Sequence, residues 1–166
     1  MRLLILGCLF WSFAAMSQTC LVDFDAATQE EEFLDNGDGT ATDLSLGLMW
    51  MRCSLGQTWQ NETCEGDASE LSWQQALQAA HGYQYADKLG WRVPNIKELA
   101  SLTERKCVRP AINELFFPNT PSDDFWTSTP SVMDHERAWV VAFFNSSNSI
   151  KDKKLFVFTR LVRNLD

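Results

Sequence analysis

Short apolar runs separated by turn residues fill most of the chain. The sequence DNGDG at 35–39 lies between two strand-like segments, 33–34 and 40–42, and this pattern predicts a β-hairpin. A second turn over 43–47 precedes the apolar run LMWM at 48–51, which predicts a further strand. The N-terminal half of the chain is therefore expected to contribute strands to an antiparallel sheet.

Two segments combine a helical period with a helix start signal. Ser72 is a good N-cap with Gln75 three residues later, and Asn95 and Glu98 repeat this spacing, so each pair forms a capping box. The first helix is expected to end near Gly82. The apolar positions expected to face the core are Trp73, Ala76, Leu77 and Ala80 in the first helix, and Ile96, Leu99 and Leu102 in the second.

The C-terminal half again has the composition of strands. Segments 125–128, 138–144, 155–158 and 161–163 are apolar or β-branched, and the polar run at 145–149 predicts a turn. The chain has no internal repeat and no low-complexity linker. These elements predict one α+β domain, in which two helices pack against an antiparallel sheet.

Length and composition fit a globular domain, and the uneven charge narrows the function. The chain has 166 residues, is 45% hydrophobic and has a formal charge of −8, which argues against a nucleic-acid-binding protein. Residues 18–87 contain thirteen acidic residues and one basic residue, whereas 88–166 contain nine acidic and twelve basic residues. The basic residues of the second half cluster as Arg105, Lys106 and Arg109, and as Lys151, Lys153, Lys154, Arg160 and Arg163.

Such basic clusters can attract an anionic polymer even on an acidic protein. Solvated faces and intramolecular ion pairs between the two halves are the alternative explanation. Lys151, Lys153 and Lys154 lie beside the polar turn and are expected to be exposed, with side chains free to meet a ligand. The candidate residues for binding an anion or a glycan are Arg105, Lys106, Arg109, Lys151, Lys153 and Lys154.

The N-terminus has the pattern of an export signal. A basic start is followed by the apolar stretch 3–13 and by small residues up to Ser17, which predicts cleavage after Ser17. A buried helix is the alternative. We therefore expect a signal peptide over 1–17, an arm over 18–32 and the domain over 33–166, with the mature protein in the periplasm or at the cell surface. No apolar run in the mature chain is long enough to span a bilayer.

Four cysteines remain after cleavage, and they are better explained by disulfides than by zinc. Their spacing lacks the CxxC pairs of zinc sites, and an exported domain favours disulfides. Three pairings are possible. Cys53 and Cys64 flank a polar segment within 53–70, expected to be a loop, so a local bridge is natural there and Cys20 is left to pair with Cys107.

A series of motifs resembles the Lcl C-terminal domain family, a bacterial domain long labelled as of unknown function. In order, the motifs are FLDNGDGT at 33–40, TD at 42–43, GLMW at 47–50, WQQAL at 73–77, WRVPNIKEL at 91–99, FWTS at 125–128, AW at 138–139 and LVR at 161–163. The resemblance covers 33–163. It implies a compact domain related to the C-type lectin-like and formylglycine-generating-enzyme folds, on exported or surface proteins.

In the adhesin that gives the family its name, this domain forms a trimeric head that binds sulfated polysaccharides. The present sequence has no Gly-X-Y stalk, so the resemblance does not carry over trimerisation or adhesion. The family motif does not specify binding residues, and none is assigned here from the resemblance.

No pattern in the sequence indicates a metal site or catalysis. The turn with Asp35 and Asp38 lacks the alternating oxygen ligands of a calcium loop, so its side chains are expected to stabilise the turn, although calcium binding there stays open. The segment VPN at 93–95 lacks the carboxylate or amide of a calcium-dependent lectin site. Ser128 and His135 are close in sequence, but no nucleophile elbow surrounds Ser128. We expect no enzymatic activity, no cofactor and no metal.

The sequence therefore predicts an exported, non-enzymatic binding module. Its expected partner is a sulfated or acidic polysaccharide, bound by the basic C-terminal half. The alternative is a structural or assembly subunit that binds an envelope protein through its aromatic surface. The sequence leaves the oligomeric state open.

Overall fold

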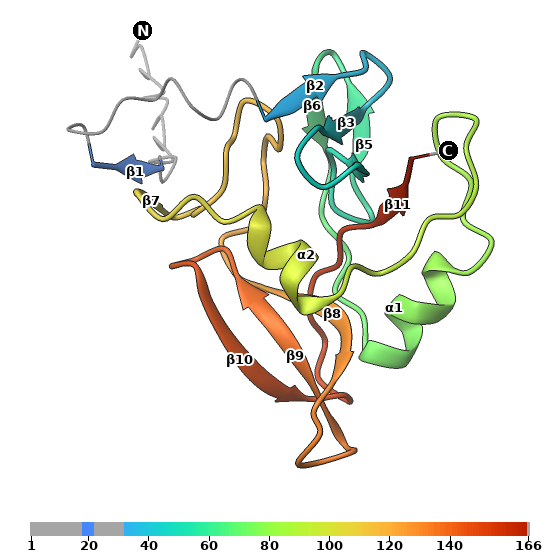
Figure 1. The fold of residues 1–166 in the computed structure, drawn as a ribbon, viewed down its shortest axis with the longest axis vertical. Helices are drawn as coiled ribbons and strands as arrows, with labels where there is room; N and C mark the ends of the chain where they lie inside the picture. The colour runs from blue at the N-terminus through green and yellow to red at the C-terminus, as the bar shows by residue number, and fades with distance from the viewer. Residues whose placement is uncertain (1–17, 22–31, 166) are drawn as a thin grey trace, which may run out of the picture.

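A computed structural model describes residues 18–21 and 32–165 (Figure 1). The predicted signal peptide, most of the arm (22–31) and residue 166 lie outside the described residues, so the structure does not bear on cleavage after Ser17. The strands are β1 (Thr19–Cys20), β2 (Phe33–Asp35), β3 (Thr40–Asp43), β4 (Leu48–Met51), β5 (Thr58–Gln60), β6 (Thr63–Glu65), β7 (Cys107–Val108), β8 (Asp124–Pro130), β9 (Arg137–Ala142), β10 (Ser147–Asp152) and β11 (Val162–Asn164), and the helices are α1 (Trp73–Ala80) and α2 (Ile96–Ser101).

These strands form several small antiparallel sheets instead of one continuous sheet. The larger two have the strand orders β11-β4-β3-β2 and β10-β9-β8, and β1-β7 and β5-β6 form two-stranded sheets. All of these pairings are antiparallel. The described residues thus form a small, mostly antiparallel domain with two helices.

The predicted hairpin and the strand that follows it are confirmed. β2 pairs with β3, and β3 pairs with β4 in a register that places Thr40 opposite Met51. The turn carboxylates bind backbone amides, since Asp35 accepts a hydrogen bond from Gly37 N at 2.8 Å and Asp43 accepts one from Ser45 N at 2.9 Å. These are the local bonds that make aspartate favourable in turns.

Both predicted helices begin with the expected capping boxes. Ser72 and Gln75 exchange side-chain and backbone bonds at the start of α1, and Asn95 and Glu98 do the same at α2. α1 contacts β8, and α2 contacts β8 and β9, so both helices pack on the three-stranded sheet (Figure 1). The predicted packing of two helices against an antiparallel sheet is therefore confirmed for the three-stranded sheet.

Three predicted segments differ from the structure. The expected loop 53–70 contains the β5-β6 hairpin, whose two turn residues, Asn61 and Glu62, both have positive φ (51° and 59°). Positive φ at both positions is typical of the type I′ turn in two-residue hairpins, but glutamate is an unusual residue for it. The turn predicted over 145–149 ends earlier, because β10 begins at Ser147. Segment 155–158 makes only isolated bridges, at Val157 and Phe158.

The core has two parts, and β4 separates them. Met49 and Met51 pack in one cluster with Trp91 and Trp126, while Leu48 and Trp50 face the other cluster, which includes residues of α2, β8 and β9. A strand buried on both faces needs an unbroken apolar sequence, which explains the run LMWM.

Two disulfides join distant parts of the chain. Cys20 pairs with Cys107 and links β1 to β7, and Cys53 pairs with Cys64. This is the connectivity that the sequence favours. No helix among the described residues is long and apolar enough to cross a membrane.

Candidate functional site

Three adjoining clefts follow the loop 119–124. The first, the Arg109 cleft, measures about 660 Å³ and is lined by Arg109, Pro110, Glu114, Asn119, Thr120, Ser122 and Phe144. The second, the Lys151 cleft, measures about 380 Å³ and shares Ser122 and Phe144 with the first. The third, the Asp67 cleft, measures about 530 Å³ and shares Asn119 with the first. The first two clefts adjoin at Ser122 and Phe144 and are together called the groove.

Arg109 and Phe144 form the most distinctive contact in this groove. The guanidinium carbon of Arg109 lies 4.8 Å from the ring centre of Phe144, which is a cation–π distance. Phe144 is 41% exposed, so part of its ring remains available to a ligand. Arg109 has a φ of 59°, and non-glycine residues in this backbone region are enriched at ligand-binding sites.

The N-terminal arm fixes the segment that contains Arg109. The side-chain amide of Gln18 donates to the carbonyl oxygens of Pro110 and Ile112, at 2.7 Å each. Leu21 N donates to Lys106 O at 2.9 Å, next to the Cys20–Cys107 disulfide. Several bonds from the arm thus hold both sides of Arg109.

A carboxyl group shares the cleft with Arg109. Burial raises the pKa of Glu114 above its ordinary value, because desolvation disfavours the carboxylate. Sequence reasoning missed Glu114 and the role of Phe144, since neither belongs to a motif and both approach Arg109 only through the fold.

The loop along the groove is anchored by a buried arginine. Arg160 is fully buried, and its guanidinium donates to the carbonyl oxygens of Met51 and Arg52 and, at 2.6 Å, to Thr120 Oγ1. Its carbon lies 4.9 Å from the ring centre of Phe117, and burial lowers the pKa of Arg160 to about 9. Although sequence analysis placed Arg160 in a basic surface cluster, it is part of the interior.

The expectation that three lysines are exposed and free is wrong for two of them. Lys151 is partly buried and forms an ion pair of 2.5 Å with Asp124. Lys153 is also partly buried, donates to His135 O at 2.6 Å and lies 4.2 Å from the ring centre of Trp73. Lys154 is exposed and pairs loosely with Glu136, at 3.8 Å. These partners lie on β8, in the β8-β9 turn and on α1, and the sequence did not indicate that they are close to the lysines.

The structure divides the six predicted binding residues. Arg109 and Lys151 line adjoining clefts, whereas Lys153 and Lys154 follow the end of β10, well away from β7 in Figure 1. Arg105 is exposed beside β7, and Lys106 is partly buried there. Only the pair Arg109 and Lys151 is brought to one groove.

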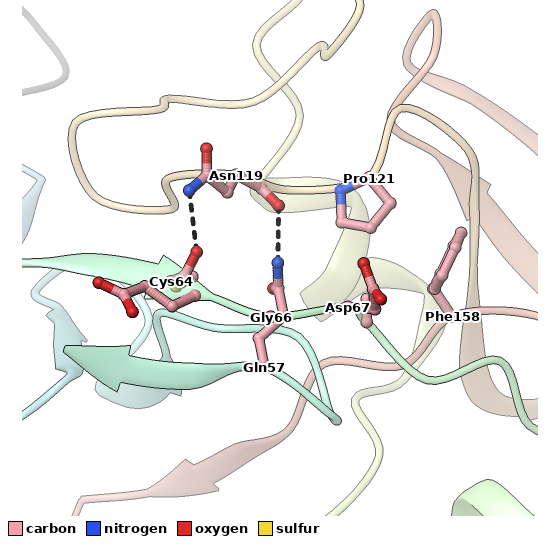
Figure 2. A pocket seen from close by; sticks show the side chains of 9 residues that line it. Gln57, Cys64, Gly66, Asp67, Asn119, Pro121 and Phe158 are labelled. Atoms are coloured by element: carbon pink, nitrogen blue, oxygen red, sulfur yellow. Dashed lines mark hydrogen bonds between the residues drawn. The ribbon is translucent and has the colours of Figure 1, made fainter.

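The Asp67 cleft has a different chemistry (Figure 2). Gln57 donates to Asn119 O at 3.0 Å, and Asn119 Nδ2 donates to Cys64 O at 2.8 Å, so this pair closes one wall. In this view Asp67 lies between these bonds and the ring of Phe158. The lining includes two carboxylates, Glu65 and Asp67, and no basic residue, which makes the cleft unsuitable for an anion.

The carboxylates of the 35–39 turn are engaged by the chain itself. Asp35 forms a 2.5 Å ion pair with Arg52, and Asp38 accepts a hydrogen bond from Thr40 N and pairs with Lys88 at 3.0 Å. Both carboxylates therefore stabilise the turn and form ion pairs with other segments of the chain. Within 18–21 and 32–165, no group of three or more His, Cys, Asp or Glu side chains could hold a metal ion.

Comparison with known families identifies the family of this chain. A family model described as the Lcl C-terminal domain matches residues 39–163. The chain belongs to the Lcl C-terminal domain family. A comparison with curated proteins finds no match.

For this Lcl C-terminal domain, the match confirms the resemblance found in the motifs. The matched region includes the whole groove from Arg109 to Lys151. Gln18 and Cys20 lie outside it, so the arm that holds the Arg109 segment is an addition to the matched region.

Proposed function

We propose that this chain is an exported, non-enzymatic module that binds an anionic polysaccharide in the groove between Arg109 and Lys151. Its fold is proposed to be related to the C-type lectin-like and formylglycine-generating-enzyme folds, as the family resemblance implies. The corresponding location is the periplasm or the cell surface, and mass spectrometry of the mature protein should find Gln18 as its first residue.

The contact between Arg109 and Phe144 is the observation that most strongly supports binding. An exposed aromatic ring can stack on the apolar face of a sugar, and a guanidinium can pair with a carboxylate or sulfate on the same unit. Asn119, Thr120 and Ser122 line the same cleft and offer amide and hydroxyl groups to sugar hydroxyls. The cleft therefore suits a ligand that is both a sugar and an anion.

The shape of the groove suits a polymer more than a single small ion. The Arg109 and Lys151 clefts adjoin at Ser122 and Phe144, so a linear chain could contact both. Lys151 is already paired with Asp124, and a ligand would have to compete for it. Arg109 is consequently expected to contribute more to affinity than Lys151.

Heparin binding by Arg109→Ala tests the proposal. Arg137→Ala is the matched control, since Arg137 is also exposed but lies on β9 and pairs with Asp134. Loss of one exposed charge contact of about 1 kcal/mol should weaken heparin binding roughly fivefold for Arg109→Ala. Arg137→Ala should bind like the wild type, and equal losses in the two variants would point to nonspecific charge attraction instead of the groove.

A structural or assembly subunit is the second candidate function. Leu115 is exposed next to Glu114 of the Arg109 cleft, which favours an apolar contact with an envelope protein. The expected aromatic surface is small, because Phe144 and Phe156 are the exposed Phe or Trp side chains of the described residues. A pull-down from envelope extracts that recovers one partner regardless of salt, and loses it in Leu115→Asp, would favour this candidate.

A further inference from the structure

The turn between β8 and β9 projects from one end of the molecule (Figure 1), and it contains two exposed apolar residues. Val132 is 95% exposed and Met133 is 89% exposed. The turn is nonetheless well defined, because Ser131 N donates to Arg137 O at 2.9 Å and Arg137 N donates to Asp134 O at 3.1 Å. The fold therefore holds these two side chains in water.

A second apolar pair lies at the same end. Leu155 and Phe156 are exposed, Phe156 at 62%, and they directly follow Lys153 and Lys154. Lys153 N donates to Glu136 O at 2.9 Å, which places this segment beside the β8-β9 turn. Val132, Met133, Leu155 and Phe156 together are called the apolar tip.

The charges around the apolar tip differ from those of the rest of the chain. Segments 131–137 and 152–156 contain three basic and three acidic residues and are neutral, whereas the whole chain has a charge of −8. The strongly acidic segment 18–87 would be repelled by an anionic surface, while Lys153 and Lys154 border the tip. An anionic surface would thus favour an approach by this end.

We propose that the apolar tip docks on an anionic lipid bilayer. Val132 and Met133 would insert at the level of the headgroups, and Lys154 would exchange its loose contact with Glu136 for a lipid phosphate.

A narrow projecting turn suits insertion into a lipid interface. A stable protein interface typically needs about 800 Å² on each partner and a complementary surface. None of the three clefts described above is lined by a residue of the tip. The shape and the local charge together favour lipid over a protein partner.

Cosedimentation of the oxidised protein with phosphatidylglycerol-containing vesicles tests this proposal. The variant Val132→Asp with Met133→Asp should bind at least tenfold more weakly than the wild type. Leu44→Asp with Leu46→Asp is the matched control, because these leucines are also exposed on a turn, between β3 and β4, and it should bind normally. Binding should fall with added salt and with vesicles of phosphatidylcholine alone.

Two further variants separate the possible outcomes. Arg109→Ala should bind vesicles as the wild type does. If Arg109→Ala loses vesicle binding while the tip variant binds normally, lipid binding belongs to the groove and the proposal is overturned. Brominated lipids should quench the fluorescence of the tryptophan introduced by Met133→Trp. This fluorescence is obtained by subtracting the signal of the native tryptophans in the wild type. The proposal is also overturned if the wild type does not bind vesicles at low salt. The same holds if the tip captures an envelope protein but does not bind vesicles.

Discussion

Replacement of Gly39 by alanine should destabilise the domain far more than the same change at Gly47. Both glycines have positive φ, 84° and 65° respectively, so alanine is strained at either position. They differ in the space around an added Cβ. At Gly39 this atom would lie 2.6 Å from the Trp59 ring and 2.2 Å from the Tyr85 hydroxyl, whereas nothing lies within 4 Å at Gly47.

The size of the difference follows from these surroundings. Left-handed backbone costs alanine about 1–2 kcal/mol at either site. Overpacking at Gly39 should add about 1–3 kcal/mol, because the Trp59 ring must move. The ring also lies 4.1 Å from the guanidinium carbon of Arg52, so its displacement weakens that cation–π contact. We expect a total of about 2–5 kcal/mol for Gly39→Ala and about 1–2 kcal/mol for Gly47→Ala.

Urea unfolding of the oxidised protein measures both free energies. A double-mutant cycle with Trp59→Ala adds a stricter test, since removal of the ring should lower the cost of Gly39→Ala, while the remaining contact with the Tyr85 hydroxyl should keep it above that of Gly47→Ala. Equal destabilisation by the two glycine variants would refute the steric explanation. An unchanged cost of Gly39→Ala without the Trp59 ring would do the same.

Three other predictions concern the arm, the second helix and the cleft. Replacing Cys20 and Cys107 by serine should lower the free energy of unfolding, measured with urea, by up to about 4–5 kcal/mol through loop entropy. It should also weaken heparin binding in affinity chromatography. Hydrogen bonds from Arg92 hold the pKa of Glu98 below its ordinary value, so Glu98→Gln should lower stability by about 1 kcal/mol at neutral pH. This difference should vanish as the pH falls through the lowered pKa, which unfolding titrations would detect. Heparin affinity should increase as the pH falls through the raised pKa of Glu114, because protonation removes a negative charge from the cleft. Calorimetric titrations of Glu114→Gln should lack this part of the increase.

The parts of the fold with local signals were predictable from the sequence. The hairpin of β2 and β3 has its aspartates and glycines within five consecutive residues, and each helix has its capping box at its start. The β5-β6 hairpin was missed because its turn, Asn61 and Glu62, uses positive φ at a residue type that rarely adopts it. The division into separate sheets depends on pairings between distant segments, such as β4 with β11, for which no local pattern exists.

The candidate site was only partly predictable for the same reason. Arg109 is recognisable as a cation in the sequence, but its neighbours Glu114 and Phe144 come from different segments. Arg160 looks like a surface charge, yet its partners Met51 and Thr120 are distant in sequence and bury it. The charge of a residue is therefore known from the sequence, while its exposure depends on long-range contacts.

The most direct test of the proposed function is a map of amide chemical-shift changes when a short heparin oligosaccharide is added to the labelled, oxidised protein at low salt. The groove account predicts the largest changes at Arg109, Asn119, Ser122 and Phe144, with small changes at Val132 and Met133. Changes confined to Lys153 and Lys154, or no changes at all, would contradict it.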